Sequence, residues 1–353
     1  MTPAYVPKEY DIFVGLDVDK KSFAFTVKDH NSMKRSKKIP SNPEKFYNYL
    51  KNNHPNKKVI CAYEAGPTGF HLCDYLTTKD IPCLVVPPLS IPKAPNERVK
   101  TNRIDSEKLA QDLKSGSVKS IRVPQGEYRQ LRYLVKTREN YSTLRKATKQ
   151  RIKALLLSAH LDAHIKDDYE QWSRNYIKEL TQLPCSDAVR QSLDMLLNDL
   201  QYAREQTLAI YRVLKTFFKK NETIDHYRRC LQSIPGIGFI VATTILGKIG
   251  DPQNLRNPRE IGAFTGLVPT EKSTGDAIRR GSITHLGNTT LRFLLIEAAW
   301  VAVRRDIQLH QFYHRIKRRH HPKIAAKKAI TAVARKLTLI IYRILKEQRM
   351  YIP

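Results

Sequence analysis

Hydrophobic positions in the first third of the chain form short runs of the kind that is typical of β-strands, separated by longer stretches with helical spacing. The strands expected from these runs are 11–18, 22–28, 58–63, 82–86 and 120–123, with 34–40 as a further candidate. The expected helices are 42–53, capped by Ser41 or Asn42, then 68–78, capped by Thr68, and 105–114. Several strands with interspersed helices predict a mixed α/β sheet domain over residues 1–125.

The pattern changes to helical spacing from about Glu127. Apolar residues recur from Tyr128 to Leu155 in a segment rich in Lys and Arg, and again from Val189 to Leu214, with a broken connector over 161–187. Two long amphipathic helices predict a hairpin or coiled coil over residues 126–225, which could protrude or oligomerise. An ordinary helical core explains the same apolar stripe.

The last region, 226–353, is predicted to be mainly helical, with helices over 239–249, 291–303 and 324–345. It opens on the turn Pro235-Gly236-Ile237-Gly238, which resembles the turn of a helix-hairpin-helix. Gly236 and Gly238 could let backbone N–H groups approach a phosphate. A glycine-rich turn between helices is also common without any ligand.

Charge indicates the kind of partner. The chain has 353 residues, with 62 Lys and Arg against 33 Asp and Glu, for a net charge of +29. Such a balance favours a polyanion, and we expect nucleic acid, with a merely basic or ribosomal protein as the alternative. The basic run 314–321 is expected to face nucleic acid. Its candidate contact residues are Arg315, Lys317, Arg318 and Arg319.

Cysteine spacing and hydropathy indicate the cellular compartment of the protein. The five cysteines are scattered and show no C-x-x-C spacing, so we expect neither a zinc site nor a disulfide framework, and a reducing cytosol. The N-terminus lacks a secretory pattern, and no apolar run approaches the length of a membrane span. We therefore expect a cytoplasmic protein without a membrane partner.

Three carboxylates fall where strands or helices begin and end. Asp17 ends the first strand, Glu64 ends a later strand, and Asp105 starts a helix. Converging on one edge of a sheet, such residues could bind Mg²⁺, which prefers oxygen ligands, and two such ions can drive phosphodiester chemistry. Any one of these residues, taken alone, is explained as well by a turn or a cap.

Several motifs together resemble a known family. G-L-D-V-D-K, E-A-G-P-T-G and K-T-N-R-I-D-S-E-K-L-A are followed by S-I-P-G-I-G, A-F-T-G-L-V-P, S-T-G and R-R-G-S-I-T-H-L-G-N-T-T-L-R. In this order they are similar to the motifs of the DEDD transposases of a bacterial insertion-sequence family. Members of that family are recombinases guided by a bridge (seeker) RNA and are related to the Piv DNA invertases. The resemblance covers both ends of the chain.

The resemblance implies a RuvC-like (RNase H-type) domain over 1–125, a coiled-coil oligomerisation region over 126–225, and a transposase domain with a catalytic serine over 226–353. It places the D-E-D-D metal ligands on Asp17, Glu64, Asn102 and Asp105. Mg²⁺ is the implied cofactor, with Mn²⁺ as a substitute. Asn102 departs from the family pattern: its amide keeps one oxygen ligand but loses the negative charge.

The serine element reads Glu271-Lys272-Ser273-Thr274-Gly275. Either hydroxyl can align with the family nucleophile, and we favour Ser273 over Thr274 because a primary hydroxyl is less hindered. Arg279 and Arg280 could stabilise charge on the reacting phosphoryl group. Without the resemblance, S-T-G reads as a turn and the two arginines as a phosphate clamp.

The resulting hypothesis is an RNA-guided DNA recombinase that cuts and rejoins donor and target DNA. Its expected partners are both DNAs, a structured guide RNA and further copies of the chain, as a dimer or tetramer with composite sites, at the bacterial nucleoid. The alternatives are a Piv-like invertase without a guide, a metal-dependent nuclease, and a non-catalytic nucleic-acid-binding derivative.

Overall fold

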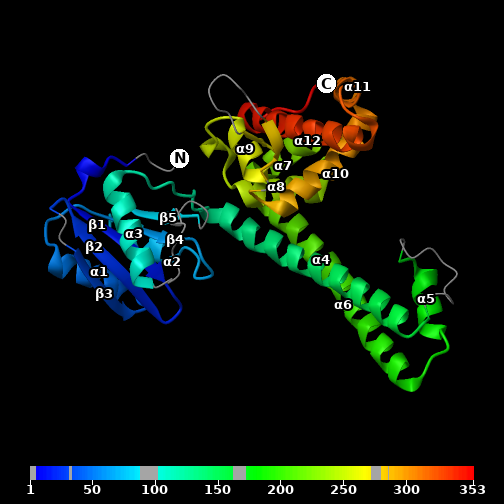
Figure 1. The fold of residues 1–353 in the computed structure, drawn as a ribbon, viewed down its shortest axis with the longest axis horizontal. Helices are drawn as coiled ribbons and strands as arrows, with labels where there is room; N and C mark the ends of the chain where they lie inside the picture. The colour runs from blue at the N-terminus through cyan, green and yellow to red at the C-terminus, as the bar shows by residue number, and fades with distance from the viewer. Residues whose placement is uncertain (1–4, 32–33, 88–101, 162–171, 272–279, 285) are drawn as a thin grey trace. The chain divides into compact units, whose positions relative to one another are not determined.

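The computed structural model describes residues 5–31, 34–87, 102–161, 172–271, 280–284 and 286–353. The chain divides into two compact units, Met1–Val123 and Pro124–Pro353, which are described separately below (Figure 1). The boundary lies close to the predicted end of the first domain. The predicted division of the remainder at residue 226 stays a prediction.

The first unit is built on a five-stranded mixed sheet with the order β3-β2-β1-β4-β5. Its strands are β1 (Ile12–Val18), β2 (Ser22–Asp29), β3 (Lys34–Pro40), β4 (Val59–Glu64) and β5 (Cys83–Val86). β1, β2 and β3 pair antiparallel, whereas β1, β4 and β5 pair parallel. These five strands were predicted. The sixth, 120–123, is wrong, because Ile121 forms only an isolated bridge to Val85.

Three helices accompany the sheet: α1 (Pro43–Asn53), α2 (His71–Thr77) and α3 (Asn102–Ser115). The Asn42 side chain accepts a hydrogen bond from the Lys45 backbone N–H at 3.0 Å, so the predicted cap of α1 is confirmed. Thr68 does not cap α2, which begins three residues later. The reason is a turn at Gly69, with φ of 70°, whose carbonyl accepts a hydrogen bond from the Tyr63 hydroxyl at 3.0 Å.

Alternation along the strands gives each face of this sheet its own core. Residues of α1 and α2 pack on one face, around Phe25, Phe46 and Tyr63. The other face packs against α3, where Phe13, Ile60 and Ala62 contact Leu109 and Leu113. The sheet is therefore covered on both sides, and α3 alone accounts for the helical cover of its second face among the described residues.

The second unit begins with two long helices, α4 (Gly126–Ser158) and α6 (Asp187–Lys220), which lie side by side (Figure 1). Both were predicted from the apolar spacing. The segment expected to be a broken connector holds a further helix, α5 (Arg174–Gln182), whose first turn is capped by the Ser173 side chain. Trp172, Tyr176 and Leu180 form a local core with the far ends of α4 and α6.

The rest of the second unit is mainly helical. Its helices are α7 (Glu222–Gln232), α8 (Phe239–Ile249), α9 (Arg259–Thr265), α10 (Thr289–Arg305), α11 (Ile307–Lys317) and α12 (Pro322–Glu347). A small hairpin pairs β6 (Pro269–Glu271) with β7 (Arg280–Ile283). Helices α8, α10 and α12 were predicted, whereas α9, α11 and the hairpin were not. A single core joins these helices to the start of α4 and the end of α6.

Candidate functional site: a carboxylate edge and a serine segment

Asp17 and Glu64 lie at the same edge of the sheet. β1 and β4 are neighbouring parallel strands, and their register pairs Leu16 with Tyr63, one residue before each carboxylate. The carboxyl ends of parallel strands meet at one edge, so the two acids are adjacent there. Both residues are half-buried. The sequence prediction that these two acids share a sheet edge is confirmed.

The two carboxylates also share a face. In β1, Phe13, Gly15 and Asp17 point to one side, and in β4 the same alternation relates Ala62 to Glu64. Phe13 and Ala62 pack against α3. Asp17 and Glu64 therefore lie on the α3 side of the sheet.

Helix α3 runs antiparallel to β1 and brings its first turn to this edge. The Tyr5 hydroxyl, before β1, donates to the Leu113 carbonyl at 2.9 Å, which fixes the end of α3 near the start of the strand. Further along, a Cβ on Gly15 would lie 2.1 Å from the Ser106 carbonyl oxygen, so strand and helix backbones touch there. The first turn, with Asn102 and Asp105, consequently lies toward the end of β1 that carries Asp17.

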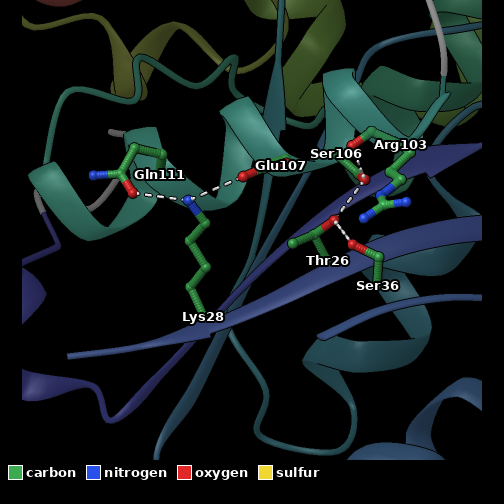
Figure 2. Close-up of polar contacts among 7 residues, drawn as sticks. All are labelled: Thr26, Lys28, Ser36, Arg103, Ser106, Glu107 and Gln111. Atoms are coloured by element: carbon green, nitrogen blue, oxygen red, sulfur yellow. Dashed lines mark hydrogen bonds and ion pairs between the residues drawn. The ribbon is translucent and has the colours of Figure 1, made fainter. Parts of the chain in front are cut away.

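Hydrogen-bonded hydroxyl groups of Thr26, Ser36 and Ser106 connect α3 to the sheet (Figure 2). Thr26 Oγ1 lies 3.0 Å from Ser36 Oγ on β3 and 2.9 Å from Ser106 Oγ on α3. Thr26 and Ser106 are buried, and Ser106 directly follows Asp105. Five residues further along α3, the Gln111 side chain accepts a hydrogen bond through Oε1 from Lys28 Nζ at 3.0 Å. These contacts fix the position of the helix that carries Asp105.

Sequence reasoning missed Gly15, Thr26 and Ser106. A glycine inside an otherwise apolar strand is a recognised sign that another backbone approaches closely, so Gly15 could have been found. The hydroxyl pair could not, because Thr26 and Ser106 are 80 residues apart and each fits its own element without the other.

The oxygen ligands at this edge fit a hard divalent cation by their chemistry, since the residues carried over from the family supply carboxylate and amide oxygens and no sulfur or imidazole. In the described ranges, no group of three or more His, Cys, Asp or Glu is close enough to hold a metal ion. The Asn102 side chain lies outside the description. Asp17 and Glu64 thus share a sheet edge with the first turn of α3 toward it, and the described residues do not form a three-ligand metal cluster.

The predicted nucleophile segment joins β6 to β7. Ser273, Thr274 and Arg279 lie outside the described residues, as does the side chain of Arg280, the first residue of β7. Glu271 at the end of β6 pairs with Arg280 at the start of β7, so the two ends of the intervening segment are adjacent. At the opposite end of the hairpin, the Thr284 N–H donates a hydrogen bond to the Val268 carbonyl at 2.9 Å.

Two of the family-like motifs form the base of this hairpin. Gly266 ends α9 with φ of 68°, and a Cβ there would lie 2.4 Å from the Leu286 carbonyl oxygen. The Asn288 N–H donates to the Phe264 carbonyl at 2.8 Å, and the Asn288 side chain caps α10 by accepting from the Leu291 N–H at 2.9 Å. A-F-T-G-L-V-P and H-L-G-N-T-T-L-R therefore contact each other, and together they anchor the hairpin.

The predicted turn at Gly236 and Gly238 lies between α7 and α8, as expected. Gly236 has φ of 86°, and a Cβ there would lie 2.2 Å from the Ala298 carbonyl oxygen, so its close backbone approach is to α10. Gly238 caps α8 and has open space beside it. A phosphate contact at this turn stays a prediction, and of the two residues Gly238 is the one with room for it.

The basic run covers the end of α11 and the turn into α12. Arg315, Lys317, Arg318 and Arg319 are all exposed. The Arg315 guanidinium lies over the Phe312 ring, 5.3 Å from the ring centroid, so an exposed charge here also contacts an aromatic side chain. A role in nucleic-acid binding stays a prediction for all four.

Two family profiles match the chain. One, described as "Transposase" and built on the DEDD transposases of IS110 type, matches residues 14–161. The other, described as "Transposase IS116/IS110/IS902 family", matches residues 228–314. The first match contains the carboxylate edge. The second contains the Gly236 turn and the hairpin, and it ends at His314, the first residue of the basic run.

Individual relatives agree with the profiles. The transposase for insertion sequence element IS1111A of Coxiella burnetii is 27% identical over 71% of this chain and 68% of its own length. The pilin gene-inverting protein of Moraxella bovis is 23% identical over 96% of this chain and 97% of its own length. The y4qE protein of Sinorhizobium fredii is 30% identical over 69% of this chain, and the match spans 58% of that relative.

The first profile covers the mixed sheet with the paired acids at its edge, and the second covers the hairpin between α9 and α10, so the class of protein indicated is a DEDD transposase. Both profiles occur in one chain, in the order that the motifs predicted. The chain therefore carries both transposase domains of the IS110/IS116 family. Within the described part of the chain, none of the helices has the length and apolar character needed to cross a bilayer.

Proposed function

We propose that this chain is an RNA-guided DNA recombinase that cuts and rejoins donor and target DNA with a serine nucleophile and Mg²⁺-binding carboxylates. One observation carries the proposal: neighbouring parallel strands present Asp17 and Glu64 at the same edge and on the same face, with the first turn of α3 at that end. A structural role alone does not call for two acids on adjacent strands.

Asp17, Glu64 and Asp105 would hold Mg²⁺, with the Asn102 carbonyl as a weaker neutral ligand. When bound, the ion supplies Lewis-acid stabilisation of charge on the phosphate oxygens. The protein's contribution is positional. Gly15 and the Thr26–Ser106 contact set the distance between the strand that carries Asp17 and the helix that carries Asp105.

The hydroxyl of Ser273 would attack the DNA phosphorus. A serine O–P bond forms, the P–O bond to one deoxyribose oxygen breaks, the serine proton passes to a base, and the leaving oxygen takes up a proton. The phosphoester keeps the bond energy needed to rejoin strands. Arg279 and Arg280 would stabilise charge on the phosphoryl group. Thr274 is the alternative nucleophile.

Assembly is part of the proposal. The acids and the serine belong to separate units of the chain, so a composite site between copies, in a dimer or tetramer, would join them. Exposed apolar residues on α6, namely Met195, Tyr202 and Val213, support association of the long helices as a coiled coil. The order of the five-stranded sheet supports an RNase H-type domain.

The guide RNA and the DNA partners rest on the family and on charge. A net charge of +29 can accommodate several nucleic-acid strands at once. In RNA-guided systems base pairing reads the target and the protein holds the backbone. Action at the bacterial nucleoid follows from the DNA substrate.

The test is a covalent-adduct assay. Purified protein with its copurified RNA and labelled donor and target DNA is incubated with Mg²⁺, then denatured. We expect an adduct that is lost in Ser273→Ala and kept in Thr274→Ala. Asp17→Asn and Glu64→Gln should also abolish it. Cleavage without an adduct, unchanged in Ser273→Ala, would indicate a hydrolytic nuclease, and binding without cleavage a non-catalytic derivative.

One observation favours a second candidate, a Piv-like DNA invertase without a guide. The relative from Moraxella bovis whose name is pilin gene-inverting protein matches nearly the whole of both chains. The chemistry would be the same. Recombination that survives complete removal of RNA by ribonuclease would favour the invertase.

A further inference from the structure

The first unit has a second polar feature at the edge opposite Asp17 and Glu64. A pocket of about 470 Å³ lies between the end of α1 and the segments that lead into β4 and β5. Tyr10, Lys58 and Pro82, which line it, each precede a strand of the parallel set. The carboxylates lie at the other ends of these strands, so the pocket is separate from the proposed catalytic edge.

Four lysines surround this pocket: Lys51, Lys57, Lys58 and Lys79. All four are exposed, and in the described part of the chain none of them forms an ion pair with an acid. The only carboxylate in the lining is Asp80, which is exposed. Four lysines against one aspartate favour an anion in the pocket, because no described acid pairs with their ammonium groups.

The wall of the pocket also offers a planar surface. Tyr47 lines it, and the Lys79 ammonium lies 5.7 Å from the centre of the Tyr47 ring. Tyr75 meets Tyr47 edge to face at 6.5 Å between centroids, which holds the Tyr47 ring in place. An aromatic ring beside lysines is the combination that binds a base and its phosphate in single-stranded nucleic-acid sites.

A third observation is a polar atom without a partner. His54, the residue that ends α1, lines the pocket, and its Nε2 is buried without a hydrogen bond in the described structure. Burial lowers the pKa of His54, as does the Arg35 cation to a smaller extent, while Asp29 opposes them. The lowered pKa favours the neutral ring, and the enclosed Nε2 would pair with the uncharged edge of a nucleobase after rotation of the side chain toward the pocket.

We propose that this pocket binds one nucleotide unit, with its phosphate on the lysines and its base against Tyr47 and His54. The volume is within the range of small-ligand sites. The shared chemistry, a phosphate joined to a planar base, could come from a nucleic-acid strand or from a free nucleotide. This site is independent of the serine and metal chemistry proposed above, because it uses none of the same residues.

The experiment measures binding of adenosine monophosphate, and of short oligoadenylates of DNA and RNA, to the full chain by calorimetry. We expect Tyr47→Leu to weaken binding of adenosine monophosphate by about tenfold, since loss of one base stack has that order of effect. Tyr49→Leu is the matched control: Tyr49 is on the same helix and half-buried, but it packs on Phe25 and does not line the pocket.

A second pair of variants keeps the test valid if Tyr47→Leu unfolds the domain. Lys51→Gln with Lys79→Gln removes two exposed pocket charges, and Lys38→Gln with Lys45→Gln removes two exposed charges elsewhere. Only the pocket pair should weaken binding of adenosine monophosphate. Equal binding by both pairs, or no binding by the unaltered chain, would overturn the proposal.

The probes separate the two sources. An oligoadenylate that binds at least about tenfold more tightly than adenosine monophosphate, and loses this advantage in the pocket variants, assigns the site to a strand. Equal affinity assigns it to free nucleotide. A chain that binds nucleotide through this pocket but forms no DNA adduct would contradict the proposed recombination and leave the pocket standing.

Discussion

Asn102 is the residue at which the candidate site departs from its family. An amide can offer one oxygen to Mg²⁺ but adds no charge, so the site should bind the ion less tightly than a D-E-D-D set. We expect Asn102→Asp to lower the Kd for Mn²⁺, used as a spectroscopic probe, by about tenfold, through one added carboxylate ligand.

Asn102→Leu serves as the control for this change, since it removes the amide oxygen and should not tighten binding. Electron paramagnetic resonance of free Mn²⁺ gives the titration. Unchanged affinity in Asn102→Asp would place this position outside the metal site. A gain of affinity together with a gain of adduct would identify the natural residue as an attenuator of activity.

Gly15 sets the closest approach between strand and helix in the first unit. A Cβ there would lie 2.1 Å from Ser106 O and 2.4 Å from Ala110 N, both of them backbone atoms that no rotamer change can move. We expect Gly15→Ala to destabilise the unit by about 1–3 kcal/mol through overpacking. Chemical denaturation followed by circular dichroism measures this.

Gly66→Ala is the control for Gly15. Its nearest neighbour to an added Cβ is an oxygen at 3.9 Å, and its φ is not positive, so the change should be nearly neutral. Equal stability of the two variants would show that α3 can shift away from β1 at little cost.

At the scale of elements, the attachment of α3 depends on side chains that the helix and the sheet do not need for their own formation. Thr26 Oγ1 and Ser106 Oγ are buried and 2.9 Å apart. We expect a double-mutant cycle of Thr26→Val and Ser106→Ala to give a coupling energy of about 1 kcal/mol. A coupling near zero would mean that Ser36 alone satisfies the Thr26 hydroxyl.

Local pattern was enough to predict most elements. The strands β1, β2, β4 and β5 follow from apolar runs, and α8 has the predicted bounds because its residues are mostly apolar between two glycines. The expected strand at 120–123 was wrong because only Ile121 pairs with the sheet, in a single bridge to Val85. Pairing is a tertiary property that an apolar run does not contain.

Other elements were missed because a stronger signal covered them. The basic residues 314–321 drew attention to charge, although Asp306, buried and capping α11, begins a helix that runs into them. Similarly, Ser173 caps α5 within a stretch that Pro184 made look irregular. Short helices of this kind depend on packing, which local sequence cannot supply.

At the scale of the whole molecule, charge governs association. If six or more phosphates are neutralised, affinity for duplex DNA should fall by about a thousandfold or more between roughly 50 and 200 mM salt. Fluorescence anisotropy with a labelled duplex measures the slope of log Kd against log salt. A slope no steeper than about one would contradict a broad electrostatic interface, despite the net charge of +29.

The candidate site, too, could be predicted from local sequence only in part, and the rest depended on contacts between residues distant in the sequence. Asp17 and Glu64 could be placed at one edge from their strand ends, since parallel pairing is the default for such an α/β pattern. Their common face and the direction of α3 required the contacts of Phe13, Gly15 and Tyr5. The serine segment could be located only through the family motifs.

Helix α4 has a mechanical consequence. It is continuous for 33 residues, roughly 50 Å, with its first turns in the core of the C-terminal helices and its last turns in the separate core around Trp172. Glu139 and Lys248, 2.7 Å apart, tie its midpoint to α8. A partner that binds the far end of α4 would therefore apply torque about that ion pair. The torque would be transmitted along α4 to the helices that anchor the β6–β7 hairpin.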